Sequence, residues 1–284
     1  MNKTMEYLIQ NKIENLDFIF WTHPDLDHSQ GIDKIIEKYL EEEHLGILCI
    51  SNGICINEIR KSARINDDKN NIIYKCFDSI NKASQKLKSN FYNIEHGIDE
   101  FGAEFVLNGE TQILRIKPFS PLSHISRQFN IRTFEHLIST ENKYTERKNL
   151  ISVGLIISFG ERKICLTSDI INNALDDVKY QKKLKDMLTN LDFFKIPHHG
   201  GKSSDIFLKL LRNDIKFAGV TTYHKTNPSI EILQKYKDKS KKLYCTSNIN
   251  NRDANNHGYG KFILKIPFEN EPIKVSVEGD TFQI

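Results

Sequence analysis

The stretch from Trp21 to Gly31 constrains the chain most, because it carries four potential metal ligands within six residues. Residues 16–21 before it are mostly apolar and short, as in a β-strand. Apolar residues after it recur at the spacing of one helical face, at Ile32, Ile35, Ile36, Tyr39 and Leu40. Asp27 or Ser29 is expected to cap that helix. The sequence therefore predicts a strand-to-helix loop that directs several polar side chains into one small volume.

The side chains of this loop favour a divalent metal. The candidate ligands are His23, Asp25, Asp27 and His28. Imidazole nitrogen and carboxylate oxygen together suit zinc, manganese or iron, whereas thiolates would select more narrowly for zinc. The alternative is a solvated polar loop that begins a helix. Two acids at alternate positions, flanked by two imidazoles, are uncommon in such a loop.

Two later segments place similar side chains at the ends of predicted strands. Two apolar strands within 149–169 end on Asp169, which could also cap a helix over 171–188. A strand over 191–197 precedes His198 and His199. Adjacent side chains point in different directions, so one histidine is expected to bind metal. The other could donate to substrate or protonate a leaving group.

These motifs resemble those of the metallo-β-lactamase superfamily. Residues 23–28 resemble its His-x-His-x-Asp-His signature, with Asp25 in place of the second histidine. This variant is similar to the hydrolase domain of bacterial DNA-uptake (competence) proteins and its free-standing relatives. Residues 167–169 resemble the family's Thr-Gly-Asp, and residues 197–204 its Pro-His-His-Gly-Ser-Lys-x-Ser, with Gly201 replacing serine. The resemblance covers roughly 17–261, and its motifs are confined to four short blocks.

The resemblance implies a single α/β domain over residues 1–284 with a metallo-β-lactamase-like αβ/βα sandwich. It implies one metal at His23 and Asp25, a second at Asp27 and His28, and Asp169 as the bridge. The family's remaining histidine at the first metal has no clear match, and Asn149 lies near its place. The expected site residues are, as metal ligands, His23, Asp25, Asp27, His28, Asp169 and His199; as catalytic residues, His198 and Asp27; and, as substrate-binding residues, Lys202, Ser203 and His224.

The function expected from these residues is that of a metal-dependent hydrolase with one or two divalent ions, zinc or manganese. A metal-bound hydroxide would attack a phosphodiester, as in a nuclease. Lys202 and the lysines of residues 235–242 favour such a substrate or a nucleic acid, although a charge run is usually a solvated face. A lactone or amide hydrolase is the alternative enzyme. A regulatory or binding module with a degenerate site is the alternative outside enzymes.

The composition excludes some other classes. With 40 basic and 37 acidic residues, the net charge of +3 does not by itself indicate nucleic-acid binding. No apolar run is long enough to cross a bilayer, and the first residues lack the apolar core of a signal peptide. Five scattered cysteines suggest reduced thiols and a cytoplasmic protein.

The beginning of the chain departs from the family. An amphipathic helix is expected within 1–15, where the family has two or three strands. Those strands lie upstream, or the fold lacks them and its open sheet edge is covered, by a partner chain or in a dimer.

The rest of the chain alternates between predicted strands and helices. A hairpin is expected about Asn108-Gly109, with Pro118 and Pro121 ending its second strand. A polar insertion over 119–149, with a helix near 129–138, is interpreted as a lid or binding loop. Further strands are expected at 45–51, 216–222, 243–247, 260–266 and 273–277, two helices within 54–100, and a helix from 229. His44, His96, His124 and His136 are expected to be exposed.

Overall fold

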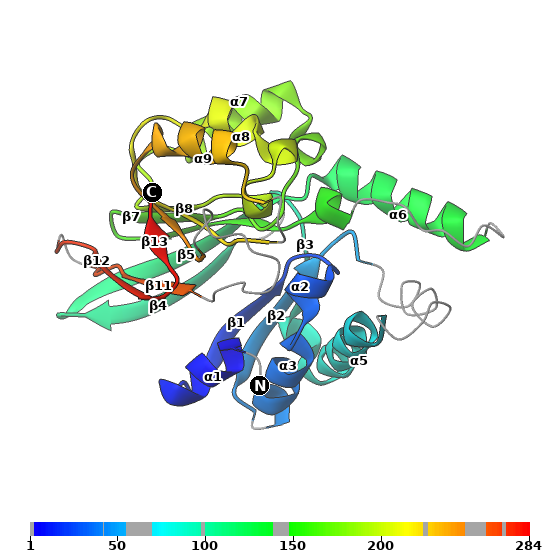
Figure 1. The fold of residues 1–284 in the computed structure, drawn as a ribbon. Coiled ribbons are helices and arrows are strands. Elements are labelled where there is room, and N and C mark those ends of the chain that lie inside the picture. Colours follow the sequence, from blue (N-terminus) through cyan, green and yellow to red (C-terminus); the bar gives the residue numbers. More distant parts are fainter. Residues whose placement is uncertain are drawn as a thin grey trace. The chain divides into compact units, whose positions relative to one another are not determined.

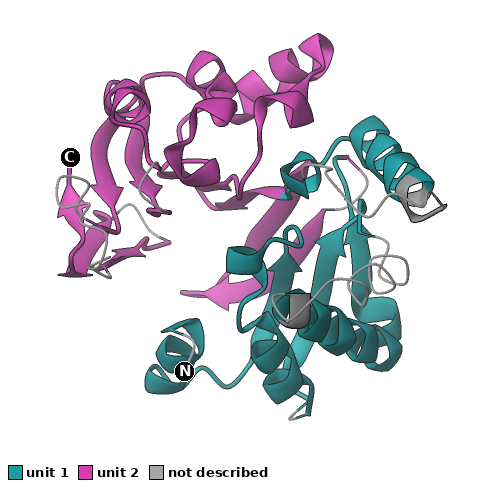
Figure 2. Ribbon diagram, turned by 45° about the vertical axis from the view of Figure 1, so that its right-hand side comes forward, with its two compact units in different colours: residues 1–96, 121–153 teal, residues 97–120, 154–284 magenta. Residues whose placement is uncertain are grey.

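The computed structural model describes residues 3–41, 43–54, 70–97, 100–138, 148–223, 227–247, 260–268 and 271–284. These residues form two compact units (Figure 2). Unit 1 comprises residues 1–96 and 121–153, and unit 2 comprises residues 97–120 and 154–284. Unit 1 contains a small parallel sheet and unit 2 a large mixed sheet, so the chain is an α/β protein. The assignment of one domain to residues 1–284 stays a prediction.

Unit 1 is built on three parallel strands in the order β1-β2-β3. The strands are β1 (Leu16–Trp21), β2 (Leu45–Ser51) and β3 (Phe91–Ile94). The helices are α1 (Lys3–Gln10), α2 (Leu26–Ser29), α3 (Ile32–Glu41), α5 (Asn70–Leu87), η1 (Lys88–Asn90), α6 (Ser123–Ile138) and η2 (Lys148–Ile151). The predicted strands at 16–21 and 45–51 are confirmed. Strand β2 is mostly buried, whereas in β1 Ile19 and Trp21 are buried and Asp17 is exposed.

The core of unit 1 fixes the end of β1, from which the ligand-rich loop leaves. Trp21 is 1% exposed and packs edge-on against Phe77 of α5, with the ring centroids 4.9 Å apart. Ile36 and Tyr39 of α3 are fully buried in the same cluster. The apolar face predicted for residues 32–40 therefore anchors α3, and the loop between Trp21 and Ile32 is held at both ends.

Unit 2 is built on eight strands in the order β13-β10-β9-β8-β7-β6-β5-β4. The strands β4 to β7 are antiparallel, β7 to β10 are parallel, and β13 pairs antiparallel with β10. They are β4 (Phe101–Leu107), β5 (Glu110–Ser120), β6 (Gly154–Phe159), β7 (Arg162–Leu166), β8 (Phe193–Lys195), β9 (Ile215–Val220), β10 (Ser240–Cys245) and β13 (Phe282–Gln283). A separate antiparallel pair is β11 (Gly260–Lys265) with β12 (Lys274–Gly279).

Side chains of the large sheet pack against other elements on both of its faces. Neighbouring residues of a strand point to opposite faces, as Phe193 and Phe194 show. Phe194 of β8 packs against Phe207 and Tyr236 on one face. Its neighbour Phe193 packs against Phe262 of β11 on the other. The helices of unit 2 are η3 (Asn172–Leu175), α7 (Val178–Met187), η4 (His198–Gly200), η5 (Lys202–Ser204), α8 (Ile206–Leu210) and α9 (Ile230–Lys237), of which α7, α8 and α9 lie over one face (Figure 1).

The predicted hairpin is confirmed, with Asn108 and Gly109 at positive φ of 51° and 83°. The prediction that Pro118 ends its second strand is wrong, whereas Pro121 directly follows the last residue of that strand, as expected. Strand β5 continues through Pro118, which faces Leu155 of β6, to Ser120, and the register shifts between these two residues of β5. A proline is tolerated at such a bulge.

Both predictions of helix caps are wrong. Asp27 and Ser29 lie inside α2, and the residue before α2 is Asp25. Asp169 does not cap a helix over 171–188, because that region forms η3 and then α7, whose cap is Asp177. The short strand β3 was not expected, and the first of the two helices expected within 54–100 falls on residues outside the described part of the chain.

No helix in the described ranges is long and apolar enough to span a membrane. The cysteines at 49, 76, 165 and 245 are free and buried. Burial, and for Cys76 also the charge of Asp33, raises the pKa of Cys76 and Cys165 above its ordinary value. These two thiols therefore stay protonated at neutral pH and are poor nucleophiles.

Candidate metal centre

The loop after β1 brings its two histidines together. We call His23, Asp25, Asp27 and His28 the loop site. His23 is fully buried, His28 is half-buried, and their ring centroids lie 4.2 Å apart. The hydroxyl of Thr22 lies 3.1 Å from Nδ1 of His23 and 3.4 Å from Nδ1 of His28. The Nδ1 atoms of both imidazoles are thus engaged by one hydroxyl.

Each histidine of the loop site has an acid beside its Nε2 atom. Asp27 Oδ2 lies 3.6 Å from His28 Nε2, and Asp25 Oδ2 lies 3.5 Å from His23 Nε2. Asp27 is exposed and is the second residue of the short helix α2. The loop therefore forms two acid–imidazole pairs, one of them open to solvent.

Asp25 also lies beside the ammonium group of Lys148 in η2. The Lys148 Nζ atom lies 3.4 Å from Asp25 Oδ1 and donates to the backbone oxygen of Pro24 at 2.9 Å. Burial alone would raise the pKa of Asp25, but the contact with His23 and then the charge of Lys148 outweigh it, so the pKa lies below its ordinary value. Asp25 is accordingly a carboxylate at neutral pH.

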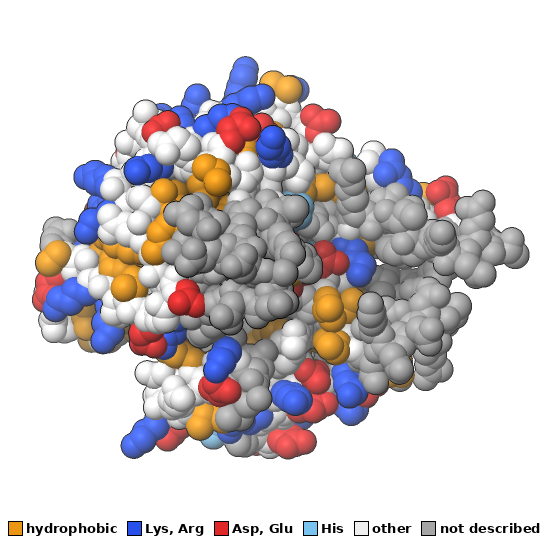
Figure 3. Space-filling view, in the orientation of Figure 1, with side chains coloured by type: hydrophobic (Ala, Val, Ile, Leu, Met, Phe, Trp, Pro, Cys, Tyr) orange, Lys and Arg blue, Asp and Glu red, His pale blue; other side chains and the backbone are white. Residues whose placement is uncertain are grey.

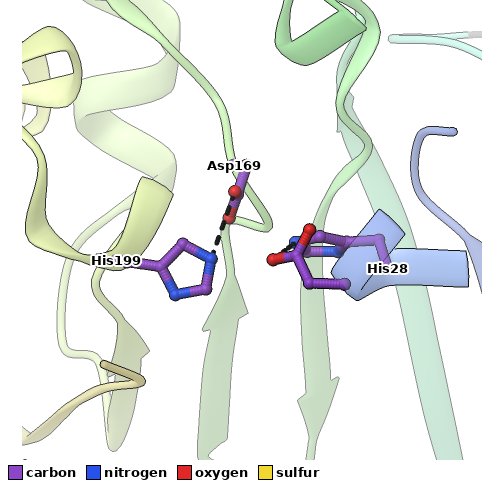
Figure 4. Close-up of side chains that lie close together, drawn as sticks. His28, Asp169 and His199 are labelled. Carbon is purple, nitrogen blue, oxygen red and sulfur yellow. Dashed lines mark ion pairs between the residues drawn. The ribbon is translucent and has the colours of Figure 1, made fainter. Parts of the chain in front are cut away.

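Unit 2 places a second group at the ends of β7 and β8. We call Ser168, Asp169, His198 and His199 the strand-end site. Asp169 and His199 are 4% and 7% exposed, and Asp169 Oδ2 lies 3.4 Å from His199 Nε2 (Figure 4). The strands β7 and β8 are parallel neighbours, so the segments after their carboxyl ends meet at one edge of the sheet. The predicted positions of Asp169 and His199 at strand ends are confirmed.

The orientation of His199 is set by residues after β9. Its Nδ1 atom lies 3.1 Å from the backbone oxygen of Thr221 and 2.9 Å from the hydroxyl of the same residue. Tyr223 stacks on the ring at a centroid distance of 4.8 Å. A proton on Nδ1 can be donated to the carbonyl oxygen, which leaves the Nε2 lone pair directed toward Asp169. This arrangement is typical of a metal-binding histidine.

The backbone of the strand-end site is strained. Ser168, His198 and His199 have positive φ angles of 48°, 46° and 51°, a region that residues with a side chain rarely adopt. The His198 amide donates to the Ser168 carbonyl at 3.1 Å, which ties the two segments together. A Cβ atom on Gly200 would lie 2.7 Å from Cβ of Pro228, and its φ is +72°, so only glycine fits. Such strain concentrates at functional sites.

His198 and its neighbours differ from His199. His198 is half-buried, and its Nδ1 atom lies 2.8 Å from the Ser203 hydroxyl. Lys202 is exposed and lies 3.5 Å from a Glu231 carboxylate oxygen. Lys195 reaches toward Asp169, with Nζ 4.0 Å from Oδ1.

Three of the remaining histidines lie in the described part of the chain. His44 and His124 are exposed, as expected, whereas His96 is half-buried. His224 and the side chain of His136 lie outside the described residues. Four further residues beside these sites were not predicted from the sequence: Lys148, Lys195, Thr221 and Tyr223. Lys148, Lys195 and Thr221 lie within predicted segments and Tyr223 directly follows one, but none of the four belongs to a recognised motif.

Comparisons with known proteins add no family to these observations. No protein-family model matches the chain, and no curated protein matches it either. The resemblance to the metallo-β-lactamase superfamily therefore stays a hypothesis. The structure itself shows an α/β protein in which aspartate and histidine side chains gather after strand ends, with Asp169 and His199 buried.

Proposed function

We propose that the protein is a metal-dependent hydrolase, in which Asp27, His28, Asp169 and His199 together hold a divalent ion. Each of them offers one nitrogen or carboxylate-oxygen ligand atom. The observation that carries the proposal is the buried pair of Asp169 and His199, because a buried carboxylate beside an imidazole oriented by Thr221 suits a cation. On this proposal the chain has the metallo-β-lactamase-like sandwich implied by its motifs.

The donor set suits zinc or manganese. The proposed ligands are two imidazole nitrogens and two carboxylate oxygens. This set has no thiolate, unlike many zinc-specific sites, and it has more nitrogen ligands than a typical magnesium or calcium site. The ion, when bound, would activate a water molecule and neutralise charge on the group under attack.

Two residues of the chain have the proton-transfer roles. His198 is half-buried and its Nδ1 atom is held by Ser203, so Nε2 can give a proton to a leaving group. Asp27 is exposed beside His28, so its carboxylate can accept a proton from water.

A phosphodiester is the substrate that the surrounding charges favour. Hydrolysis of a phosphodiester requires neutralisation of its non-bridging oxygens, and lysines can supply part of that charge. In Figure 3, lysine and arginine side chains gather over the upper part of unit 2, where α7, α8 and α9 lie, with acids among them. Lys202 pairs with Glu231, and Lys242 lies over the ring of Phe217. A nucleic acid is the corresponding partner, and His224 stays a proposed substrate contact.

The proposal is tested first by metal content. Protein purified without chelator and loaded with Mn²⁺ or Zn²⁺ is expected to retain metal. His199→Ala is expected to lose it, because a ligand is removed. His198→Ala is expected to retain metal and to hydrolyse bis(p-nitrophenyl) phosphate at least about a hundredfold more slowly, the usual contribution of a general acid.

Each other outcome points to a specific alternative. Activity on a lactone with none on any diester would identify a lactone or amide hydrolase. Wild-type protein that takes up no metal, with a melting temperature unchanged by manganese or zinc, would leave a binding or regulatory module. Metal loss in His198→Ala with retention in His199→Ala would exchange the roles of the two histidines.

A further inference from the structure

We propose that the metal centre holds a single divalent ion, because the ammonium groups of Lys148 and Lys195 lie beside carboxylate oxygens of Asp25 and Asp169 that a second ion would need. This inference rests on the proposed function and specifies the number of ions at that site. The motif resemblance assigns a first metal to His23 and Asp25. The contacts of both lysines oppose that assignment.

The first observation lies in the loop site. Asp25 carries a cation-type neighbour on each oxygen, with His23 Nε2 3.5 Å from Oδ2 and Lys148 Nζ 3.4 Å from Oδ1. Lys148 also donates to the Pro24 carbonyl at 2.9 Å, so a backbone oxygen of the same loop keeps the ammonium in place. A divalent ion bound by Asp25 and His23 would lie close to this fixed positive charge. Like charges at that distance repel, most strongly where little water screens them.

The second observation lies in the strand-end site. The two oxygens of Asp169 face different partners, since Oδ2 lies 3.4 Å from His199 Nε2 and Oδ1 lies 4.0 Å from Lys195 Nζ. The Lys195 ammonium also donates to the backbone oxygens of Ser168 and Ile196, at 3.2 and 3.4 Å. A bridging carboxylate gives one oxygen to each of two ions. Here the oxygen on the side away from His199 faces an ammonium.

The two observations are independent, because the lysines belong to different units and different segments of the chain. Each lysine lies beside a carboxylate to which the resemblance assigns the first metal, Asp25 as a ligand and Asp169 as the bridge. Both contacts thus oppose a second ion, and the proposed ion keeps Asp27, His28, Asp169 and His199 as its ligands.

The inference is tested by counting bound ions, which requires no activity measurement. Plasma mass spectrometry and calorimetric titration with Mn²⁺ and Zn²⁺ are expected to give one ion per wild-type chain. Asp25→Asn is expected to keep that ion, whereas Asp27→Asn weakens or loses it. Replacing both lysines, as Lys148→Met and Lys195→Met, is expected to raise the count toward two.

Matched controls come from lysines that are paired with acids elsewhere. Lys82 pairs with Asp78 at 3.2 Å in unit 1, and Lys261 pairs with Glu278 at 2.8 Å in unit 2. Lys82→Met and Lys261→Met each remove one positive charge and are expected to leave the count at one. A rise in the number of bound ions that is seen in the Lys148→Met and Lys195→Met double variant, but not in these controls, cannot be due to lower net charge alone.

The failures of the two proposals are distinguishable. Two ions in the wild type would overturn the single-ion inference and leave the proposed hydrolase intact. No ion in the wild type would overturn the proposed function itself. One ion that is lost in Asp25→Asn would place the ion at His23 and Asp25 and overturn the inference, as would a folded double-lysine variant that still binds one.

Discussion

His199 owes its orientation to neighbours that carry no motif of their own. Thr221 meets its Nδ1 atom with both a carbonyl and a hydroxyl oxygen, and Tyr223 covers one face of its ring. A sequence motif can identify His199 as a candidate ligand, but the choice of tautomer depends on a residue 22 positions later. Contacts of that kind follow from the pairing of β8 with β9, which places the two segments side by side.

Removal of the Thr221 hydroxyl tests this orientation. Thr221→Val keeps the backbone oxygen and nearly the same volume, so the imidazole is expected to keep its place but lose one polar contact. Partners that orient a metal-binding histidine typically change metal affinity 10- to 100-fold, and a loss of about tenfold is expected because the carbonyl remains. Thr189→Val, whose hydroxyl contacts Asp186 elsewhere, is the control. Equal affinity in wild type and Thr221→Val, by calorimetric titration, would remove the hydroxyl from the site.

The site residues differ in how far the sequence could predict them. His23, Asp169 and His199 stand within three residues of the end of an apolar run, so their positions near strand ends follow from the sequence pattern. Lys148 and Lys195 could not be selected among 40 basic residues, because their contacts with Asp25 and Asp169 depend on how distant segments pack. The assignment of ligands to a metal stays a prediction.

At the scale of elements, the apolar strands were predictable and the capping residues were not. The runs at 16–21, 45–51, 154–159 and 162–166 are long enough to show strand character, whereas β3 has four residues and only its last is buried. Capping is decided by one or two residues at a turn, and several acids compete for it. Asp177 caps α7, whereas Asp169, the acid predicted as the cap, lies too far before the first residue of that helix.

Asp192, which directly precedes β8, joins β7 and β9 of unit 2 through a buried charge. It is 1% exposed, and its carboxylate lies 3.3 Å from the Arg162 guanidinium and 2.7 Å from Lys216 Nζ, and it accepts from the Lys163 amide at 2.8 Å. Arg162 itself is 7% exposed and also donates to the carbonyls of Pro267 and Glu271. The carboxylate therefore balances a buried guanidinium between β7 and β9.

Asp192→Ala is expected to lower the free energy of unfolding by about 3–5 kcal/mol, because it leaves the Arg162 charge buried without its carboxylate. Glu278→Ala removes the acid of an exposed pair with Lys261 and is expected to cost at most about 1 kcal/mol. Urea denaturation of the two variants measures the difference. Similar midpoints for both would show that water reaches Arg162 and compensates for the loss.

At the scale of the whole molecule, the chain crosses between its units more than once. Unit 1 takes residues 1–96 and then 121–153, and the hairpin of β4 and β5 between them belongs to unit 2. No change in composition marks these crossings, which is why the sequence indicated a single domain. Among the described strands, β1 is an edge strand of its sheet, and the covering of that edge by a partner chain or a second copy stays a prediction.

The proposed ion has a consequence that reaches both units. If Asp27 and His28 of unit 1 and Asp169 and His199 of unit 2 bind the same ion, metal should slow amide hydrogen exchange in two separate segments, 22–29 and 168–201. Binding to the native state alone stabilises it by about 2.7 kcal/mol when the free metal is a hundredfold above its dissociation constant. His199→Ala should abolish the added protection in both segments, although the mutation lies in only one. The strands β11 and β12, which contain none of the four ligands, are the internal control. Protection confined to one unit, or protection in 22–29 that persists in His199→Ala, would mean that each unit binds metal by itself.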